Sequence, residues 1–135
     1  MIWKPPRRAI ITGSRHWDCY PCLKRILDDL HATVPFEEFA VGDCPRGADE
    51  HLLRWAYDHD DVGLTVFSAE WLKNGKAGGP LRNQRMVDEF KHNLCIAFFW
   101  GPHAGCKGTS DCVRRAKEAG HATIIEVNHR PEPCL

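Results

Sequence analysis

Five short apolar runs are separated by segments in which apolar residues recur with helical spacing. The runs cover residues 8–12, 36–41, 64–67, 94–100 and 122–127. Ala9, Ile10 and Ile11 follow one another without polar alternation, which is typical of a central strand covered on both faces. The pattern therefore predicts five β-strands, with the first and fourth inside the sheet.

The segments between these runs predict helices. Leu23, Ile26, Leu27 and Leu30 have the i, i+3, i+4, i+7 spacing of one apolar helix face. Asp18, or Tyr20 followed by Pro21, is the expected start of this helix. A second helix is expected over about 48–58. Pro80 should begin a third after a mobile, glycine-rich loop at 74–79.

The last helix is expected to begin at a cap formed by Thr109 or Ser110 and to end at Gly120. Its inner face would consist of Cys112, Val113, Ala116 and Ala119. Strands that alternate with helices indicate a Rossmann-like three-layer α/β/α fold with a five-stranded, mainly parallel sheet in the order 3-2-1-4-5. We expect one domain over residues 1–135, with its core at about 7–127 and a polar tail at 128–135.

The amino-acid composition narrows the classes of macromolecule and membrane that we expect the protein to bind. The chain has 135 residues, and its 18 Lys and Arg residues balance 18 Asp and Glu residues. Zero net charge gives no long-range attraction to nucleic acid, so we do not expect nucleic-acid binding. No apolar run reaches the roughly 20 residues of a membrane span, and the first residues lack the apolar core of a signal peptide. We expect a cytoplasmic protein that does not bind membranes.

Seven cysteines are an odd number, which argues against a complete secreted disulfide set. Cys95 and Cys112 fit apolar patterns and are expected in the core. Cys19 and Cys22 form one CxxC pair, and Cys44, Cys106 and Cys134 are candidates to lie near it. A structural zinc site usually has a second closely spaced Cys or His pair, which is not evident here, so we expect no metal.

The candidate ligand-binding residues follow the ends of the predicted strands. Ligands of open parallel sheets bind outside the carboxyl ends of the strands. Glycines allow close backbone approach, and hydroxyl and guanidinium groups suit phosphate oxygens. The candidates are Thr12, Gly13, Ser14 and Arg15; Gly42, Asp43, Arg46, Gly47, Ala48 and Asp49; Arg82, Asn83 and Arg85; and Gly105, Gly108, Thr109 and Ser110.

Each of these segments also has a plain structural interpretation. The Gly13 segment could be an ordinary strand-to-helix turn with a surface Arg15. Asp49 could accept hydrogen bonds from sugar hydroxyls or compensate the dipole of a helix. Arg82 and Arg85 are three residues apart and could grip a phosphate from two sides, or belong to a solvated helix face.

Five motifs occur in one order: Thr12-Gly-Ser-Arg15, Arg46-Gly-Ala-Asp49, Ala69-Glu-Trp71, Gly79-Pro-Leu-Arg-Asn-Gln-Arg-Met86 and Gly108-Thr-Ser-Asp111. Together they resemble the YpsA-related branch of the SLOG superfamily, which includes the lonely-guy phosphoribohydrolases and DprA. The resemblance implies a Rossmann-like pocket for a nucleotide or nucleotide-derived ligand, held by a protein that senses, sequesters or processes it, often in phage–host conflict. It also makes a homodimer plausible.

The resemblance supports a ligand-binding function more strongly than a catalytic one. Lonely-guy enzymes place a catalytic Glu three residues after the Thr of the phosphate loop, and Cys112 occupies that position here. Asp111 is one residue earlier, about 100° around a helix. The alternative function is hydrolysis of an N-glycosidic bond in nucleoside phosphates, with Asp111 and Glu70 as catalytic candidates and Asp43 and Asp49 as further carboxylates. Single-stranded DNA binding is the least favoured function.

Overall fold

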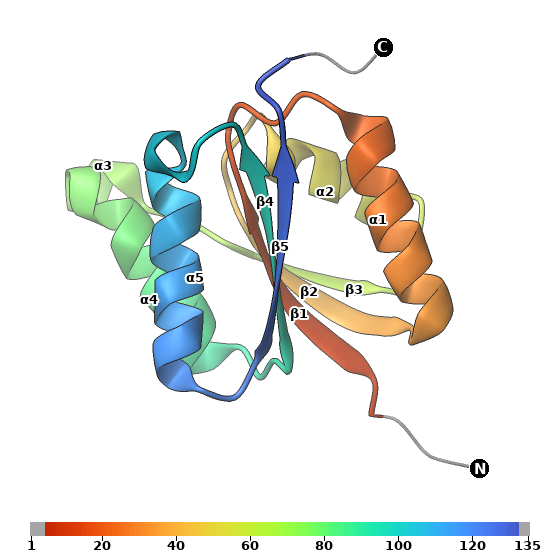
Figure 1. Ribbon diagram of the computed structural model, residues 1–135. Helices are drawn as coiled ribbons and strands as arrows, with labels where there is room; N and C mark the ends of the chain where they lie inside the picture. Colours follow the sequence, from red (N-terminus) through yellow and green to blue (C-terminus); the bar gives the residue numbers. More distant parts are fainter. Residues whose placement is uncertain (1–4, 133–135) are drawn as a thin grey trace.

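A computed structural model of the chain describes residues 5–132 and shows helices on both sides of a single sheet (Figure 1). The elements are β1 (Arg7–Gly13), α1 (Tyr20–Thr33), β2 (Phe36–Gly42), α2 (Ala48–Tyr57), β3 (Gly63–Phe67), α3 (Trp71–Asn74), α4 (Gly78–Glu89), β4 (Leu94–Trp100), α5 (Lys107–Ala119) and β5 (Thr123–His129). Two 3₁₀ turns, Gly75–Ala77 and His103–Gly105, precede α4 and α5.

The five strands are all parallel and lie in the order β3-β2-β1-β4-β5, which confirms the predicted topology. Helices α1 and α2 cover one face of the sheet, and α3, α4 and α5 lie on the other (Figure 1). Side chains of β1 alternate between these two layers. Ala9 and Ile11 pack with Trp55 on one side, whereas Ile10 packs with Met86 on the other.

The predicted starts of α1 and α5 need correction. The N-cap of α1 is Cys19, neither Asp18 nor Tyr20, because the Cys19 sulfur accepts a hydrogen bond from the Cys22 amide at 3.3 Å. Helix α5 begins at Lys107 after Cys106, so Thr109 and Ser110 lie in its first turn and do not cap it.

The C-terminal end of α5 lies where the sequence pattern predicted it. Gly120 ends the helix in the left-handed conformation with φ 77°, as predicted. Cys112, Val113 and Ala116 are buried, whereas Ala119, the last residue of the helix, is exposed.

The glycine-rich segment 74–79 is helical and not an open loop. It contains the end of α3, the 3₁₀ turn and the first two residues of α4, so Pro80 is the third residue of that helix. A Cβ on Gly78 would overlap the carbonyl oxygen of Ala69, and one on Gly79 would lie 3.2 Å from the Trp71 ring. These glycines therefore let α4 pack closely against the 69–71 segment.

The last strand is longer than predicted. β5 extends to His129 and pairs with β4 up to Trp100, so Asn128 and His129 belong to the sheet and not to a polar tail. Among residues 5–132, no helix has the length and apolar character needed to cross a membrane.

The cysteines fall into distinct groups. Cys95 and Cys112 are fully buried, which confirms their place in the core. Cys19 and Cys22 form a disulfide, while Cys44, Cys95, Cys106 and Cys112 are free. Cys134 lies outside the described residues.

Gly13 is needed because α2 begins directly against the end of β1. A Cβ at this position would overlap the Cβ of Ala48 and lie 3.0 Å from that of Phe98. The Ala48 amide donates to the Ser14 carbonyl at 3.0 Å, which fixes this approach. The absence of a side chain at Gly13 therefore brings the start of α2 to the carboxyl end of β1.

Gly13→Ala is expected to lower the free energy of unfolding by about 1–3 kcal/mol, since the new methyl group overpacks the contact with Ala48. Urea unfolding would measure this change. Gly108→Ala is the matched control, because no atom lies within 4 Å of its added Cβ. Combining Gly13→Ala with Ala48→Gly should recover part of the loss. Equal stability of Gly13→Ala and the wild type would contradict the packing role.

Candidate functional site

A cavity with a volume of about 780 Å³ opens at the carboxyl ends of β1, β2 and β4. It lies where the strand order reverses between β1 and β4, which is the usual ligand position in an open parallel sheet. Its volume is in the range of small-molecule sites. The residues around it are Ile11, Thr12, Gly13, Ser14, Arg15, Gly42, Cys44, Asp49, Trp71, Gly79, Pro80, Arg82, Asn83, Met86, Ala104, Gly105, Cys106, Lys107, Gly108, Thr109 and Asp111.

Arg82 crosses from α4 to the end of β2. Its Nη1 donates to Asp43 Oδ1 at 3.1 Å, and its Nε donates to Asn83 Oδ1 at 3.0 Å. A Cβ on Gly42 would lie 2.5 Å from Arg82 Nη1, so the glycine leaves the space that the guanidinium occupies. The positive charge of Arg82 is thus already paired with a carboxylate beside the cavity.

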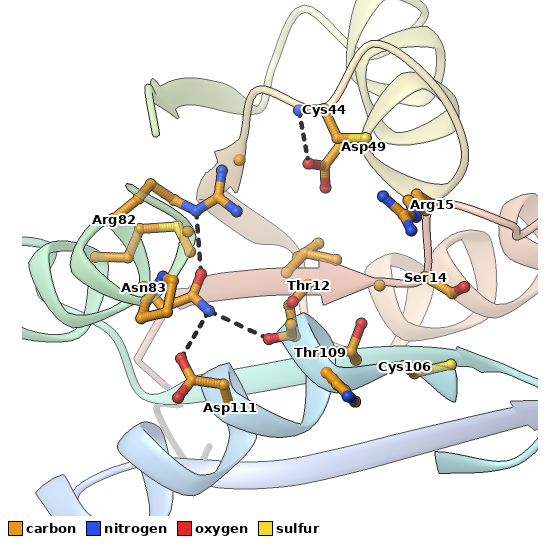
Figure 2. Close-up of a pocket in the computed structure, with 18 of the residues that line it drawn as sticks. Thr12, Ser14, Arg15, Cys44, Asp49, Arg82, Asn83, Cys106, Thr109 and Asp111 are labelled. Atoms are coloured by element: carbon orange, nitrogen blue, oxygen red, sulfur yellow. Dashed lines mark hydrogen bonds between the residues drawn. The ribbon is translucent and has the colours of Figure 1, made fainter. Parts of the chain in front are cut away.

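Asn83 joins α4 to α5 beneath the cavity (Figure 2). Its amide nitrogen donates to Asp111 Oδ2 at 3.0 Å and to the Gly108 carbonyl at 3.2 Å, and the residue is only 3% exposed. Because Asn83 also accepts from Arg82, its amide satisfies groups from both helices. It therefore fixes the first turn of α5 relative to α4.

Asp111 is held as a carboxylate. Arg115 Nε donates to its Oδ2 at 2.8 Å, and Arg114 Nη2 donates to its Oδ1 at 2.9 Å. Burial acts to raise the pKa of Asp111, but hydrogen bonds from Arg115, Asn83 and Arg114 outweigh burial and lower the pKa below its ordinary value. Asp111 is thus suited to stabilise positive charge and not to exchange a proton near neutral pH.

The pKa of Asp49 is shifted in the opposite direction from that of Asp111. It is 6% exposed at the start of α2, and its Oδ2 accepts the Cys44 amide at 3.1 Å. Burial raises the pKa of Asp49 to about 6, against the lowering effects of the Cys44 hydrogen bond and the charge of Arg82. A carboxyl group with this pKa, on the wall of a cavity, can gain or lose a proton near neutral pH.

Two cations border the cavity and have no ionic partner in the part of the chain that the structure describes. Within residues 5–132, neither Arg15 nor Lys107 forms a hydrogen bond or ion pair through its side chain, and both are exposed. Figure 2 shows Arg15 on the same side of the cavity as Asp49. Lys107 begins α5, whose first turn contains no acidic residue and whose N-cap forms no side-chain hydrogen bond. This helix terminus and the two cations favour an anion.

The cavity brings together most of the predicted ligand-binding residues, from four separate segments of the chain. Those that line it are Thr12, Gly13, Ser14, Arg15, Gly42, Asp49, Arg82, Asn83, Gly105, Gly108, Thr109 and the catalytic candidate Asp111. The residues outside its lining are Asp43, Arg46, Gly47, Ala48, Arg85, Ser110 and the second catalytic candidate, Glu70.

The hypothesis that Arg82 and Arg85 grip a phosphate together is not supported by their positions. Arg85 Nη1 donates to the Ser68 carbonyl at 3.1 Å, and its Nε donates to Glu89 at 3.3 Å, on the exposed side of α4. Glu70 is exposed before α3, outside the cavity. Arg46 is also exposed, and Gly47 instead provides a positive φ of 73° where its α-carbon packs against the Arg15 backbone.

Sequence reasoning did not select several residues that line the cavity: Ile11, Cys44, Trp71, Gly79, Pro80, Met86, Ala104, Cys106 and Lys107. Lys107 stands directly before the Gly108 motif, so its position was a usable signal. Met86 belongs to the hydrophobic core and also lines the cavity. Cys44 and Cys106 gave no signal, because a free cysteine has no characteristic ligand spacing.

Comparison with known proteins places this architecture in a family. The sequence profile of the YspA, cpYpsA-related SLOG family matches residues 7–73, from β1 to α3. The Gene 61 protein of Mycobacterium phage D29 is 37% identical over 130 residues, covering 93% of this chain and 99% of the relative. This chain belongs to the YspA, cpYpsA-related SLOG family. No solved structure matches it significantly.

In this SLOG-family protein, the position that matches the lonely-guy catalytic Glu is buried. Cys112 is 0% exposed and packs with Ile10, Met86 and Cys95 beneath the sheet. Asp111, one residue earlier, does line the cavity. The carboxylate that α5 contributes to the cavity therefore comes from a different position of the helix and is paired with Arg114 and Arg115.

Asp49 should make the stability of this SLOG-family protein depend on pH. Its folded-state pKa of about 6 is above the value of 3.8 for a free Asp, so folding favours the neutral form. This stabilisation is complete below the unfolded pKa and is lost as the pH rises through the folded pKa. Asp49→Asn keeps an acceptor for the Cys44 amide but has no charge.

Relative to the wild type, Asp49→Asn should therefore gain up to about 3 kcal/mol in unfolding free energy between about pH 4 and pH 7. Urea unfolding across this pH range measures the difference. Glu50→Gln, at the next and exposed position, is the control and should show little change. Parallel pH profiles for Asp49→Asn and the wild type would rule out this effect.

Proposed function

We propose that this protein binds a nucleotide or nucleotide-derived ligand in the cavity at the β1–β4 switch point, as a sensor, sequestering or processing protein. The observation that carries the proposal is the placement of the charges. The carboxylate of Asp111 and the guanidinium of Arg82 are already paired, whereas Arg15 and Lys107 are not paired within the described residues. The cavity therefore retains positive charge for an incoming anion.

The phosphate position we propose is between the Gly13–Arg15 segment and the first turn of α5. Gly108 and Thr109 follow Lys107 there, and all three border the cavity. Backbone N–H groups of a first helical turn lack partners in the helix, and the dipole adds to their attraction for phosphate. The Thr109 hydroxyl, on a residue that is 3% exposed, is a further donor at this place.

The rest of the cavity would hold the sugar and base. Asp49 is placed to accept hydrogen bonds from ribose hydroxyls. Trp71 is 55% exposed and borders the cavity, so its ring offers a face for a base. Ile11 and Met86 provide apolar surface below. This combination of apolar wall and a few polar groups is typical of sites for small organic ligands.

Isothermal titration against AMP, CMP, NAD, ADP-ribose and cyclic nucleotides should identify at least one that binds. Arg15→Gln and Lys107→Gln should each weaken its binding by about 10- to 100-fold, which is the loss of one charge-assisted hydrogen bond. Arg25→Gln, on the exposed face of α1, is the charge-matched control and should leave binding unchanged.

Titration with the corresponding nucleoside, which lacks the phosphate, separates the phosphate contact from contacts to the sugar and base. It should bind more weakly than the nucleotide, and Arg15→Gln should not weaken it further. Folded protein that binds no compound of the panel would overturn the proposal. Equal loss of nucleoside and nucleotide binding in Arg15→Gln would remove the phosphate assignment.

A second candidate function is hydrolysis of the N-glycosidic bond of a nucleoside phosphate, and Asp49 is the observation that favours it. Its pKa of about 6 allows the neutral form to donate a proton to the departing base. Asp111, held ionised by Arg115 and Arg114, would stabilise the positive charge that develops on the sugar. Water would then complete the cleavage. Glu70 has no part in this scheme, since it is outside the cavity.

Release of free base from AMP and CMP, followed by liquid chromatography, tests this reaction. Asp49→Asn should slow the release by about 100-fold or more, because it removes the proton donor. Asp111→Asn should also abolish it, whereas Glu50→Gln should not. Binding without base release from any nucleotide of the panel would leave the binding function and exclude the hydrolase.

A further inference from the structure

A second group of chemically reactive side chains lies away from the cavity, where α1 begins and β5 ends. Cys19 is the N-cap of α1, Cys22 lies in its first turn, and His129 is the last residue of β5. Their two sulfurs and one ring nitrogen all lie within 4.8 Å of one another. In Figure 1 both element ends lie at the same edge of the molecule. Residues more than a hundred positions apart therefore meet as three potential metal ligands.

The spacing between the ligand atoms suits a tetrahedral metal. Cys22 Sγ and His129 Nε2 are 3.5 Å apart. Zinc bonds of roughly 2.3 Å to sulfur and 2.0–2.1 Å to nitrogen, at a tetrahedral angle, place the two atoms about 3.6 Å apart. The Cα atoms of Cys19 and Cys22 are 5.4 Å apart, so both side chains can turn toward one centre.

The orientation of His129 is the one that a ligating imidazole needs. Its Nδ1 is 2.7 Å from the carbonyl oxygen of Arg130, which only accepts hydrogen bonds. The proton of the neutral ring is therefore on Nδ1, and the Nε2 lone pair faces the sulfur of Cys22. A backbone carbonyl on the second nitrogen is the common outer-shell arrangement of metal-bound histidines.

The surroundings hold these groups in place. Trp100 stacks on the His129 ring at 4.5 Å and 14°, and Trp17 meets the same ring edge-on at 5.3 Å. Trp17 Nε1 donates to the Cys19 carbonyl at 2.8 Å, and the Cys22 amide donates to Cys19 Sγ at 3.3 Å. An amide donor stabilises a thiolate, and aromatic walls limit the access of water.

We propose that the dithiol form of Cys19 and Cys22, together with His129, binds Zn²⁺ and joins the start of α1 to the end of β5. This differs from our expectation from the sequence, which found no second ligand pair. The two cysteines form a disulfide in the structure, so the metal-binding form requires two electrons and two protons. Two molecules of a thiol reductant supply them and become one disulfide. Zinc then displaces two protons, which go to solvent, and binds the two thiolates.

Protein purified under reducing conditions should retain one zinc per chain after gel filtration with a weak chelator, measured by mass spectrometry of the metal. Replacement by Co²⁺ should give the visible absorption of a tetrahedral site with sulfur-to-metal charge transfer. Removing the metal with a strong chelator should lower the midpoint of thermal unfolding by at least about 5 °C, because the metal binds only the folded form.

Cys19→Ser is the sharpest variant, since serine keeps an N-cap acceptor for α1 but loses the thiolate. It and His129→Ala should lose the metal and the cobalt spectrum. Cys44→Ser and His121→Ala are the matched controls and should keep one zinc. Reduced wild-type protein without stoichiometric zinc, or Cys19→Ser that retains the cobalt spectrum, would overturn the proposal; neither result bears on nucleotide binding.

Discussion

The backbone of Ser14 is the junction on which the site depends. Its amide donates to the Phe98 carbonyl of β4 at 2.9 Å, and its carbonyl accepts the Ala48 amide at the start of α2 at 3.0 Å. One residue thus links the end of β1 to two elements that come 34 or more residues later in the chain. Because Gly13 has no side chain, α2 can come this close. The cavity opens beside this junction, where β1 and β4 diverge toward helices on different faces.

The charged side chains around the cavity are of two kinds, those paired with neighbouring residues and those exposed at the entrance. Arg82 and Asp111 have partners from neighbouring elements, and Asn83 lies between them. These groups hold α4, α5 and β2 together, and their interactions are formed before any ligand arrives. Arg15 and Lys107 are exposed at the entrance. A ligand anion can therefore interact with the entrance cations without breaking the network below, which is how a preorganised site limits the cost of binding.

The segment 14–19 connects the two regions of chemical interest. It leaves the cavity at Ser14 and Arg15 and reaches the Cys19 cap of α1 within four residues of Arg15. Trp17 is 2% exposed between them and packs against Phe98 of β4 as well as the His129 ring. Trp17 therefore ties the segment that presents Arg15 to the cavity to the ends of β4 and β5.

Local pattern was enough to predict the strands, the parallel order and the cavity edge. Apolar runs, helical spacing and the glycine at 120 act over a few residues, and the right-handed connection of parallel strands leaves few topologies. The glycine turns after β1 and β4 were therefore found at one site, as the sequence indicated.

Only the tertiary structure decided which of the candidate side chains line the cavity. Arg85 is held by Ser68 and Glu89, Glu70 lies outside the cavity, and Asp49 acquires its raised pKa from burial in the folded chain. His129 meets Cys22 across 107 positions. Spacing along a chain cannot specify such partners, because hydrogen bonding, burial and charge depend on whatever the fold brings within a few ångströms.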